Sequence, residues 1–327
     1  MDNKWRPTAN LELIKLRAWL LKSVRDFFSQ RDLLEVETPL LGRHTVSDPH
    51  LKSFTVGSAC GGENLFSGFL QTSPEYFMKR LLAAESVSIF QICKAFRDEE
   101  MGCHHNPEFT LLEWYRCGYD HRQLMLEVRE LIDELFASKA KKLTWDSFSY
   151  QQLFEKYLGI NPHVVSRDVL LELCVAYVGL EQVQGLTKDN CLDLLLSYNI
   201  VPKLKNKGAV FVFDYPRSQA ALAKLSKKAD NIVVASRFEL YINGLEIANG
   251  YHELTDQQEQ KKRFADDNGR RQKSGSDDVI ADDKLLAALE AGLPECAGVA
   301  IGLDRLLMAL SGAKTIAEVQ AFAFNSV

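Results

Sequence analysis

The sequence has 327 residues, of which 46% are hydrophobic, 25% charged and 10% aromatic, the composition of an ordinary globular chain. This composition excludes extensive disorder and fibrous structure, and the length fits one large domain or two smaller ones. Thirty-nine Lys and Arg residues against 44 Asp and Glu residues give a formal net charge of −5. The negative sign argues against a chain whose main task is to bind nucleic acid, although it is compatible with a local basic patch.

Membrane and disulfide signals are missing from the sequence. No apolar run approaches the roughly 18 residues that a membrane span needs, and the amino-terminal residues do not resemble a signal peptide, so we expect a cytoplasmic protein. The 7 cysteines are odd in number, scattered and without a C-x-x-C pair, which predicts reduced thiols. Zinc ligands could come from Cys93, Cys103, His104, His105 and Cys117, but their spacing matches no common zinc template.

Helical and strand-like patterns follow one another unevenly along the chain. Apolar residues recur at helical spacing over residues 9–30, and a strand that ends at Pro39 follows. Further strands, most of them joined by short turns, are predicted over residues 52–57, 64–70, 87–97, 109–117, 210–214, 231–242, 245–250 and 297–302. Because few helices separate these strands, the pattern favours an antiparallel sheet flanked by helices, and the predicted fold class is α+β.

Two long segments carry no chemical motif. Residues 118–205 are predicted to be largely helical, with helices over 122–138, 167–178 and 187–198, and we interpret them as a scaffold or an inserted helical subdomain. Residues 266–283 are charged, contain Gly and Ser, and have almost no large apolar residue, which predicts a mobile loop.

The first group of candidate site residues begins a helix. Ser73 can cap a helix whose first residue is Pro74 and whose exposed first turn holds Glu75. A carboxylate in the first turn also suits the positive end of the helix dipole, so a simple capped helix is the alternative to a binding role.

The second group lies in residues 87–117, two strand-like runs around a polar loop, which predicts a long-looped hairpin. Arg97 and Glu99 on the outgoing run are two residues apart and share a face. On the returning run, one face carries Phe109, Glu113 and Tyr115. Such a surface suits a nucleotide, because Arg binds phosphate through two hydrogen bonds and an aromatic ring stacks on a base. A solvated hairpin face with an ion pair is the alternative.

The third group surrounds an Asn-Gly pair at residues 243–244, a strong signal for a hairpin with a two-residue type I′ turn. A regular hairpin would pair Tyr241 with Glu246 and Glu239 with Ala248, so these four side chains are expected on one side. Two nearby carboxylates repel unless a cation lies between them, and Mg²⁺ bound to phosphate oxygens fits that need. Solvent-facing glutamates on an edge hairpin are the alternative.

The fourth group is GVAIGLDRLLMAL, which predicts a strand that runs into a helix. Gly298, Ala300 and Gly302 alternate on one face and would let a ligand approach the backbone. Arg305 in the first helical turn opposes the helix dipole unless an anion is bound, so the pattern fits an anion site or a surface charge beside a capping Asp304. No P-loop and no G-x-G-x-x-G fingerprint occurs.

In this order the groups resemble the catalytic core of class II aminoacyl-tRNA synthetases, in the subclass of the lysine, aspartate and asparagine enzymes. The helix and strand up to Pro39 are similar to motif 1, FRDEE…HHNPEFTLLEWY to motif 2, and GVAIGLDRLLM to motif 3. SPEYFMKRL, EFTLLEWY, EIANGYHELTD and GLDR are most similar to lysyl-tRNA synthetase. Because that enzyme carries an amino-terminal anticodon module and the core here begins at residue 10, we expect one catalytic domain over 1–327, a possible helical insertion at 140–205, and no anticodon-binding domain.

The pattern is identified as that of the stand-alone lysyl-tRNA synthetase paralogues, the family of elongation factor P (R)-β-lysine ligases. The resemblance implies a homodimeric ligase that activates β-lysine or lysine with ATP and Mg²⁺ and transfers it to a lysine of elongation factor P, without tRNA. The alternatives are a truncated lysyl-tRNA synthetase or related lysine-adenylating ligase and, outside enzymes, a catalytically silent regulator that binds lysine or ATP.

The resemblance also implies roles for single residues. The two catalytic arginines would be Arg97, at the α-phosphate, and Arg305, at the γ-phosphate. Further ATP-binding residues, with the ring of Phe109 on adenine, would be Asp98, Glu99, Asn106, Phe109, Glu246, Ile247 and Gly302. The metal ligands would be Glu239 and Glu246. The substrate-binding residues, with Glu75 at the amino group nearest the carboxylate and Tyr115 and Glu253 at the distal ammonium, would be Ser73, Pro74, Glu75, Tyr115, Glu253 and Ala300.

Three positions depart from lysyl-tRNA synthetases. Ala300 stands where those enzymes have a glycine, as in the β-lysine ligase family, and its methyl group would reshape the floor of the amino-acid pocket. A single methyl group usually discriminates between substrates by only ~1 to 3 kcal/mol. Cys103 replaces a residue that is more often basic, and Asp98 replaces a common Asn.

Overall fold

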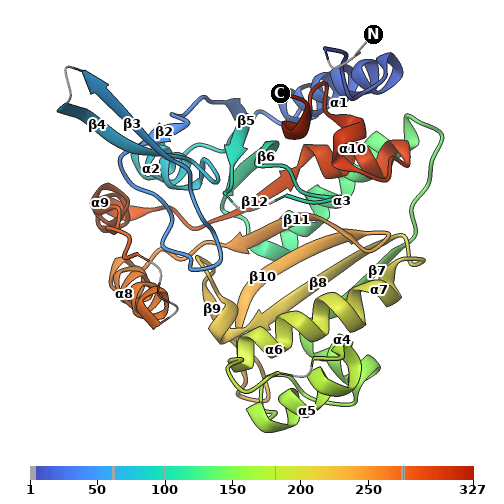
Figure 1. Cartoon of the computed structure of the whole chain (residues 1–327), viewed down its shortest axis with the longest axis vertical. Helices are drawn as coiled ribbons and strands as arrows, with labels where there is room; N and C mark the ends of the chain where they lie inside the picture. Colours follow the sequence, from blue (N-terminus) through green and yellow to red (C-terminus); the bar gives the residue numbers. More distant parts are fainter. Residues whose placement is uncertain (1–4, 61–62, 99–100, 181, 274, 276) are drawn as a thin grey trace. The chain divides into compact units, whose positions relative to one another are not determined.

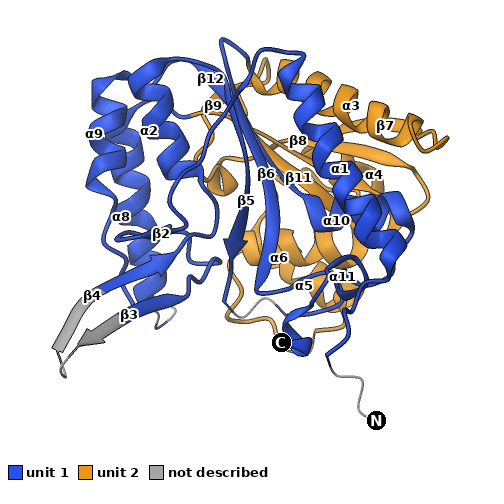
Figure 2. Ribbon diagram, turned by 90° about the horizontal axis from the view of Figure 1, so that it is seen from above, with its two compact units in different colours: residues 1–119, 254–327 blue, residues 120–253 orange. Residues whose placement is uncertain are grey.

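A computed structural model describes residues 5–60, 63–98, 101–180, 182–273, 275 and 277–327, without the side chains of 58–60 and 63–66. The chain divides into two compact units, Met1–Tyr119 with Leu254–Val327 and Asp120–Glu253, called unit 1 and unit 2 (Figures 1 and 2). Each unit combines a sheet with helices, so the predicted α+β class is confirmed. In the described part of the chain, no helix is both long and apolar enough to cross a membrane.

Unit 1 opens with the predicted amphipathic helix, α1 (Leu11–Ser29). The side chain of Asn10 caps it by accepting a hydrogen bond from the backbone nitrogen of Leu13 at 2.9 Å. Its buried face consists of Leu20, Val24, Phe27 and Phe28, with helical spacing.

The sheet strands of unit 1 are β1 (Leu34–Glu35), β5 (Ile89–Phe96), β6 (Glu108–Cys117) and β12 (Cys296–Gly302), in the order β1-β5-β6-β12. Strand β1 is parallel to β5, and the other neighbours are antiparallel. The long-looped hairpin of β5 and β6 is confirmed. A smaller sheet contains β2 (Leu41–Gly42), β4 (Glu63–Leu70) and β3 (Thr55–Cys60).

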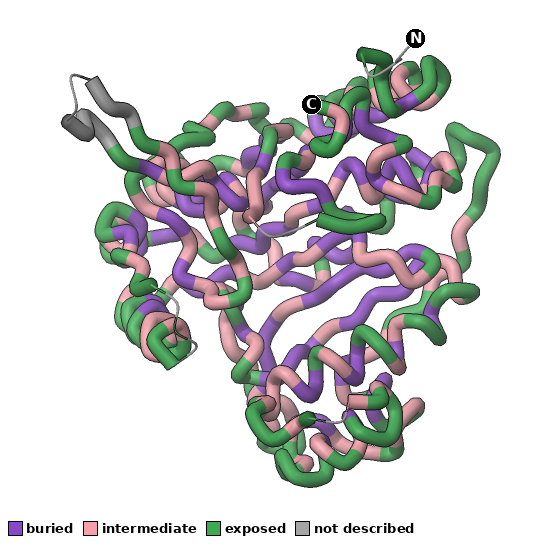
Figure 3. Tube along the Cα trace, viewed as in Figure 1, coloured by how far each residue is buried: buried purple, intermediate pink, exposed green. Residues whose placement is uncertain are grey.

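Helices complete unit 1. Their bounds are α2 (Glu75–Glu85), α8 (Gln257–Lys273), α9 (Asp283–Gly292), α10 (Leu303–Ser311), α11 (Ile316–Val319) and a terminal 3₁₀ turn (Phe324–Ser326). Helix α9 packs between α2 and α8. Buried residues follow the central strands and one side of each helix (Figure 3).

The predicted mobile loop at 266–283 is wrong over its first part, because α8 continues to Lys273. Complementary charges one turn apart support this polar helix: Arg263 pairs with Glu259 at 3.0 Å and Arg270 with Asp267 at 2.5 Å. Its last turn is basic, which suits the negative end of the helix dipole. Apolar periodicity alone therefore misses a helix that charge pairs hold.

A buried carboxylate joins three elements of unit 1. Asp304, in the first turn of α10, is 2% exposed; it accepts a hydrogen bond from the backbone nitrogen of Thr110 on β6 at 2.7 Å and pairs with the guanidinium of Arg17 on α1. Arg17 also donates from Nε to the carbonyl of Val319 at 3.1 Å. Asp304 therefore fixes the first turn of α10 to the sheet and to α1 rather than capping the helix.

Unit 2 also combines strands with helices. Its strands, in the order β11-β10-β8-β7 with β9 on β10, are β7 (Trp145–Ser149), β8 (Ala209–Pro216), β9 (Leu225–Lys227), β10 (Val233–Ile242) and β11 (Leu245–His252). Its helices are α3 (His121–Ala137), α4 (Tyr150–Leu158), α5 (Arg167–Val178), α6 (Lys188–Leu195), a π-helical turn (Leu196–Ile200), α7 (Val201–Leu204) and a 3₁₀ turn (Arg217–Gln219).

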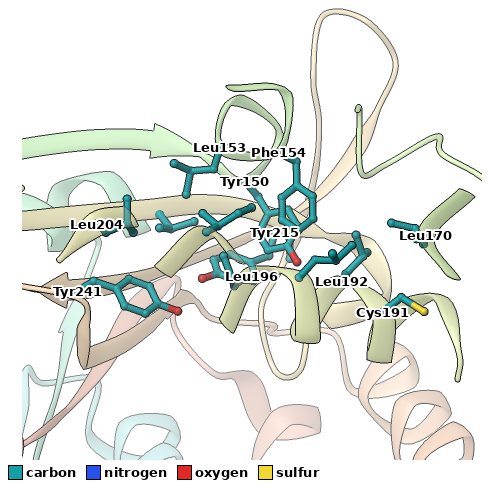
Figure 4. Packing of buried hydrophobic residues seen from close by; sticks show 14 of the residues in the cluster. Tyr150, Leu153, Phe154, Leu170, Cys191, Leu192, Leu196, Leu204, Tyr215 and Tyr241 are labelled. Atoms are coloured by element: carbon teal, nitrogen blue, oxygen red, sulfur yellow. The ribbon is translucent and has the colours of Figure 1, made fainter. Parts of the chain in front are cut away.

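The core of unit 2 lies between the helices α4 to α7 and one face of the strands β8 and β10 (Figure 4). In this core, the ring centroid of Tyr150 lies 4.6 Å from the ring centroid of Phe154 and 4.8 Å from that of Tyr215. The sequence reading overlooks β7 and α4. Ser149 and Gln152 form a capping box at the start of α4, a local signal that apolar spacing does not contain.

We expect Arg17→Met to lower the free energy of unfolding by about 3 kcal/mol, because the buried carboxylate of Asp304 loses its cation. Urea unfolding followed by tryptophan fluorescence measures the change. The control is Arg25→Met, which removes an exposed pair with Glu35 and should cost less than about 1 kcal/mol. Equal losses in the two variants would contradict a special role of the buried pair.

Candidate active site

Small residues of β12 and polar residues of β6 meet on one face of the sheet of unit 1. Gly298 pairs with Tyr115, Ala300 with Glu113, and Gly302 with Leu111. Directly opposed residues of an antiparallel pair point to the same face. The predicted small-residue face of β12 therefore lies beside the two polar side chains of β6.

Glu113 is the centre of the polar contacts on this face. It is 3% exposed, and its two carboxylate oxygens accept hydrogen bonds from the Tyr115 hydroxyl at 2.7 Å and from the Ser73 hydroxyl at 2.8 Å. The two hydroxyl donors therefore fix the direction of both carboxylate oxygens of Glu113. The sequence reading placed Glu113 on this face but gave it no role; a carboxylate inside the apolar run LLEWY was the available signal.

The helix start at Ser73 differs slightly from the prediction. Helix α2 begins at Glu75, and Pro74 stands at the N-cap. The Ser73 hydroxyl still accepts a hydrogen bond from the backbone nitrogen of Glu75 at 3.0 Å. One oxygen of the Glu75 side chain accepts a bond from the ammonium of Lys79 at 2.7 Å, and Lys79 is 2% exposed. Lys79 therefore holds the Glu75 carboxylate in place.

Arg97 follows the last residue of β5, and its guanidinium carbon lies 5.0 Å from the ring centroid of Phe109. The structure thus brings together the cation and the ring expected at a nucleotide. Asp98 lies beside Lys52, with 3.6 Å between the carboxylate and the ammonium. Glu99 lies outside the described residues.

Asn106 is 8% exposed, and its side-chain amide makes two hydrogen bonds to backbone groups. The amide nitrogen donates to the carbonyl of Glu108 at 2.7 Å, and the amide oxygen accepts from the backbone nitrogen of Phe324 at 3.0 Å. These bonds give Asn106 a structural task, since they tie the β5–β6 loop to the carboxyl-terminal segment.

Arg305 also contacts the β5–β6 loop. Its Nε donates to the carbonyl of His104 at 3.2 Å, and a terminal nitrogen lies 2.6 Å from Nε2 of His105. The carbonyl of Cys103 accepts a hydrogen bond from the backbone nitrogen of Ile316 at 2.8 Å, which fixes the loop to the start of α11. The arginine of the fourth motif and the loop of the second are therefore neighbours.

In unit 2, the predicted type I′ turn is confirmed, because Asn243 and Gly244 have φ of 52° and 79°. The pairing beyond it is not regular. Tyr241 pairs with Glu246 as predicted, but a bulge leaves Ile247 as an extra residue, and Glu239 pairs with Asn249. The expectation that Ala248 shares the face of Glu239 is wrong, whereas Glu246 shares it.

Glu239 is 6% exposed and is held by its own strand. One oxygen accepts from the Arg237 guanidinium at 2.6 Å and the other from the Tyr241 hydroxyl at 2.5 Å. Burial raises the pKa of Tyr241 well above its usual value, and the nearby Glu239 carboxylate raises it further, so the hydroxyl remains a donor. Although burial opposes its charge, Glu239 and other neighbours hold the pKa of Arg237 well above its usual value.

The remaining candidates of unit 2 lie on β11 and just after it. Glu246 is partly exposed, Ile247 is 3% exposed, and Glu253 is 1% exposed and bridges to Ala223. Opposite Glu239, Asn249 donates to the Tyr251 hydroxyl at 2.9 Å, and its buried amide oxygen has no hydrogen bond. The sequence reading missed Asn249, since only the bulge brings it to this face.

Potential metal ligands also gather at His44, Asp282 and Asp283 in unit 1, the one group of three found among the described residues. Asp282 caps α9 by accepting from the backbone nitrogens of Lys284 and Leu285, and the Asp283 side chain is 81% exposed. A helix cap with a nearby histidine accounts for this group. The improbable zinc set of cysteines and histidines is not found among the described residues.

The mostly antiparallel strands, the arginines on a long hairpin loop and at a helix start, and the buried carboxylates are features of a class II synthetase core. The family model of class II tRNA synthetases for D, K and N matches residues 3–326, and the chain belongs to this family. Within it, three similar relatives carry the name elongation factor P (R)-β-lysine ligase. They come from Mannheimia succiniciproducens (45% identity, 98% of each chain), Vibrio vulnificus (46%, 99% of each) and Salmonella gallinarum (43%, 97% of each).

Two cysteines near the site should differ in reactivity. Burial, with a smaller contribution from the Glu113 carboxylate, raises the pKa of Cys93 to about 12, whereas Cys103 is exposed. Because the thiolate is the reactive form, we expect N-ethylmaleimide at pH 7.5 to modify Cys103 well before Cys93. Peptide mass spectrometry over a time course measures both, and equal rates would contradict the buried environment of Cys93.

Gly302→Ala should impair ATP use without affecting the fold. An added methyl group would lie 3.9 and 4.0 Å from Cβ and Cδ of Arg305, an ordinary contact, so the free energy of unfolding should hardly change. We expect the nucleotide to lie against Gly302, where a methyl group should raise the KM for ATP about tenfold, since such a misfit costs ~1 to 3 kcal/mol. Gly185→Ala, which has nothing within 4 Å, is the control. An unchanged KM in Gly302→Ala would remove this backbone from the ATP site.

Proposed function

We propose that the chain activates (R)-β-lysine with ATP and joins it to the ε-amine of a lysine on elongation factor P. The main support is the sequence identity of 43–46% between this chain and relatives named elongation factor P (R)-β-lysine ligase, over 97–99% of both chains. The buried carboxylate of Glu113, opposite Ala300 in the sheet, supports a substrate that carries an ammonium group.

ATP use follows from the class II family, and Arg97, Phe109 and Arg305 are proposed to bind the nucleotide. The contact of Arg97 with the ring of Phe109 supports a site where a planar base and a phosphate are held together. Arg305 reaches the β5–β6 loop and is suited to the terminal phosphate. The open backbone at Gly302 gives room for the nucleotide. Asp98, Glu99 and Ile247 are proposed to complete this set.

Mg²⁺ is proposed to bind to Glu239 and Glu246, which share a face of the β10–β11 hairpin. The donor set fits, because Mg²⁺ prefers carboxylate oxygens together with phosphate oxygens. Each Glu239 oxygen accepts one hydrogen bond, and a carboxylate oxygen has a second lone pair for an ion. When bound, the ion supplies positive charge against the triphosphate. Arg237 and Tyr241 hold the Glu239 carboxylate in position.

Substrate recognition is proposed to use the acidic side chains to which the family resemblance points, together with Glu113. In unit 1, Glu75 would meet the amino group nearest the substrate carboxylate, and Glu113 with Tyr115 would receive an ammonium group. In unit 2, Glu253 would receive the distal ammonium. The methyl group of Ala300, beside Glu113 in the sheet, would favour the β-amino isomer.

The reaction needs no residue that acts as a base in its first step. A substrate carboxylate oxygen forms a bond to the α-phosphorus of ATP while the bond to pyrophosphate breaks, which gives an acyl adenylate. Arg97 and Arg305 lower the barrier by alignment and by neutralising charge. The deprotonated ε-amine of the acceptor lysine then forms the amide bond, AMP leaves, and the proton of the amine passes to solvent.

A homodimer that acts without tRNA is part of the proposal. Exposed apolar side chains support a second copy at the segment around motif 1, where Leu34 is 58%, Leu40 36% and Leu41 39% exposed. Neighbouring Glu37, Thr38 and Pro39 line a groove of about 550 Å³. A tRNA-charging assay distinguishes the proposed ligase from a truncated lysyl-tRNA synthetase.

Two assays test the proposal: ATP–pyrophosphate exchange, and the mass of elongation factor P after the reaction. We expect ATP–pyrophosphate exchange with (R)-β-lysine to exceed that with α-lysine, and elongation factor P to gain one lysyl mass. Arg97→Ala should lower exchange by a factor of ~10² to 10³ through the loss of charge at the α-phosphate. The control is Arg31→Ala, because Arg31 covers the ring of Phe27 in a similar contact elsewhere in unit 1.

The outcomes separate the alternatives. Exchange without any mass gain would contradict transfer to elongation factor P. ATP binding without exchange would indicate the silent regulator. Equal exchange in wild type and Arg97→Ala would remove Arg97 from the site.

A further inference from the structure

The chain carries a concentrated basic surface outside the proposed active-site residues. Two segments of unit 2, residues 138–146 and 201–208, together contain six lysines and a single acidic residue, Asp146, in a sequence of net charge −5. We name these lysines the lysine surface: Lys139, Lys141, Lys142, Lys203, Lys205 and Lys207. Five of them are exposed, and Lys207 is partly exposed.

Backbone contacts hold the two segments together. Thr144 accepts a hydrogen bond on its carbonyl from Ala209 at 2.9 Å, and its hydroxyl donates to the carbonyl of Lys207 at 2.9 Å. From there β7 and β8 run parallel, with Trp145 opposite Ala209 (Figure 1). The lysines therefore form one fixed surface, although Thr144 and Lys207 are 63 positions apart in the sequence.

The lysine surface adjoins the hairpin that carries Glu239 and Glu246. The backbone nitrogen of Asn243 donates to the carbonyl of Gly208 at 2.8 Å. Gly244 lies against the second segment so closely that a Cβ there would come within 3.3 Å of the Val201 carbonyl and 3.4 Å of Lys205 Cα. The surface thus begins at the turn of the hairpin with the proposed metal ligands.

A helix-end role explains only part of this arrangement. Lysines after a helix stabilise its negative end, and Lys139, Lys141 and Lys142 follow α3. Lys203 and Lys205 lie in and just after the last turn of α7, so the same effect applies to them. The effect falls off within the last turn, so two helix ends do not require six lysines. Lys207 lies 3.8 Å from Asp146, the one acidic residue of the two segments, which still leaves these segments with a formal net charge of +5.

We infer that the lysine surface docks the acidic face of the acceptor protein, an inference that rests on the proposed function. A protein acceptor is far larger than its target lysine, so the enzyme must contact it beyond the reacting amine. Charge at contact distance decides such docking, because the screening length is about 8 Å at physiological salt and the overall charge acts little beyond it. A protein is favoured over nucleic acid because the proposed reaction requires a protein acceptor to dock and does not require nucleic acid.

The experiment uses the charge-reversal variant Lys142→Glu/Lys205→Glu and measures both steps of the reaction. We expect kcat/KM for elongation factor P to fall at least ~10-fold at low salt, with pyrophosphate exchange unchanged. Unchanged exchange also shows that the variant is folded. The control is Lys261→Glu/Lys262→Glu, the same charge change on exposed residues of α8, which should leave both steps as in wild type. Raising KCl from 50 to 300 mM should slow transfer more in wild type than in the surface variant.

Distinct results would overturn the inference. Normal transfer in the surface variant would contradict it, and so would equal loss in the α8 control. Binding of a labelled RNA hairpin that the surface variant loses, with transfer intact, would assign the surface to nucleic acid instead. Failure of the proposed function is separate, since wild type itself would then show no transfer.

Discussion

The carboxylate of Asp304 is the contact on which the site of unit 1 depends. It is buried, and it receives the Arg17 guanidinium and the backbone nitrogen of Thr110. These bonds fix the passage from β12 to α10, where Gly302 and Arg305 stand on either side of it. The positions of the Gly302 backbone and of the Arg305 side chain are thereby set by a buried residue.

The proposed binding carboxylates show the same design. Lys79 holds Glu75, two hydroxyls hold Glu113, and Arg237 with Tyr241 holds Glu239. A buried carboxylate is tolerated when its charge is compensated or its oxygens receive hydrogen bonds. Such partners also fix the direction of each oxygen before a ligand arrives, so less order has to be gained on binding.

Local patterns in the sequence predicted much of the fold and the family. Alternation gave the β5–β6 hairpin, the Asn-Gly pair gave the type I′ turn, and the motif order gave the class II family that the whole-chain match confirms. The polar helix α8 was missed because charge pairs rather than apolar residues support it. The partners Lys79 and Arg237 were missed because their role depends on burial, which spacing does not contain. The roles of the site residues remain predictions.

The bulge at Ile247 decides which residues of β11 lie opposite Glu239. Along a strand, sides alternate, so one extra residue exchanges odd and even positions for the rest of the strand. With it, Asn249 and Tyr251 oppose Glu239 and Arg237; without it, Ala248 and Gly250 would do so. A relative that lacked only the extra residue could keep the rest of this strand's sequence and still present the opposite set of side chains. Which side chains of β11 lie opposite Glu239 therefore depends on the number of residues after the turn as well as on their identity.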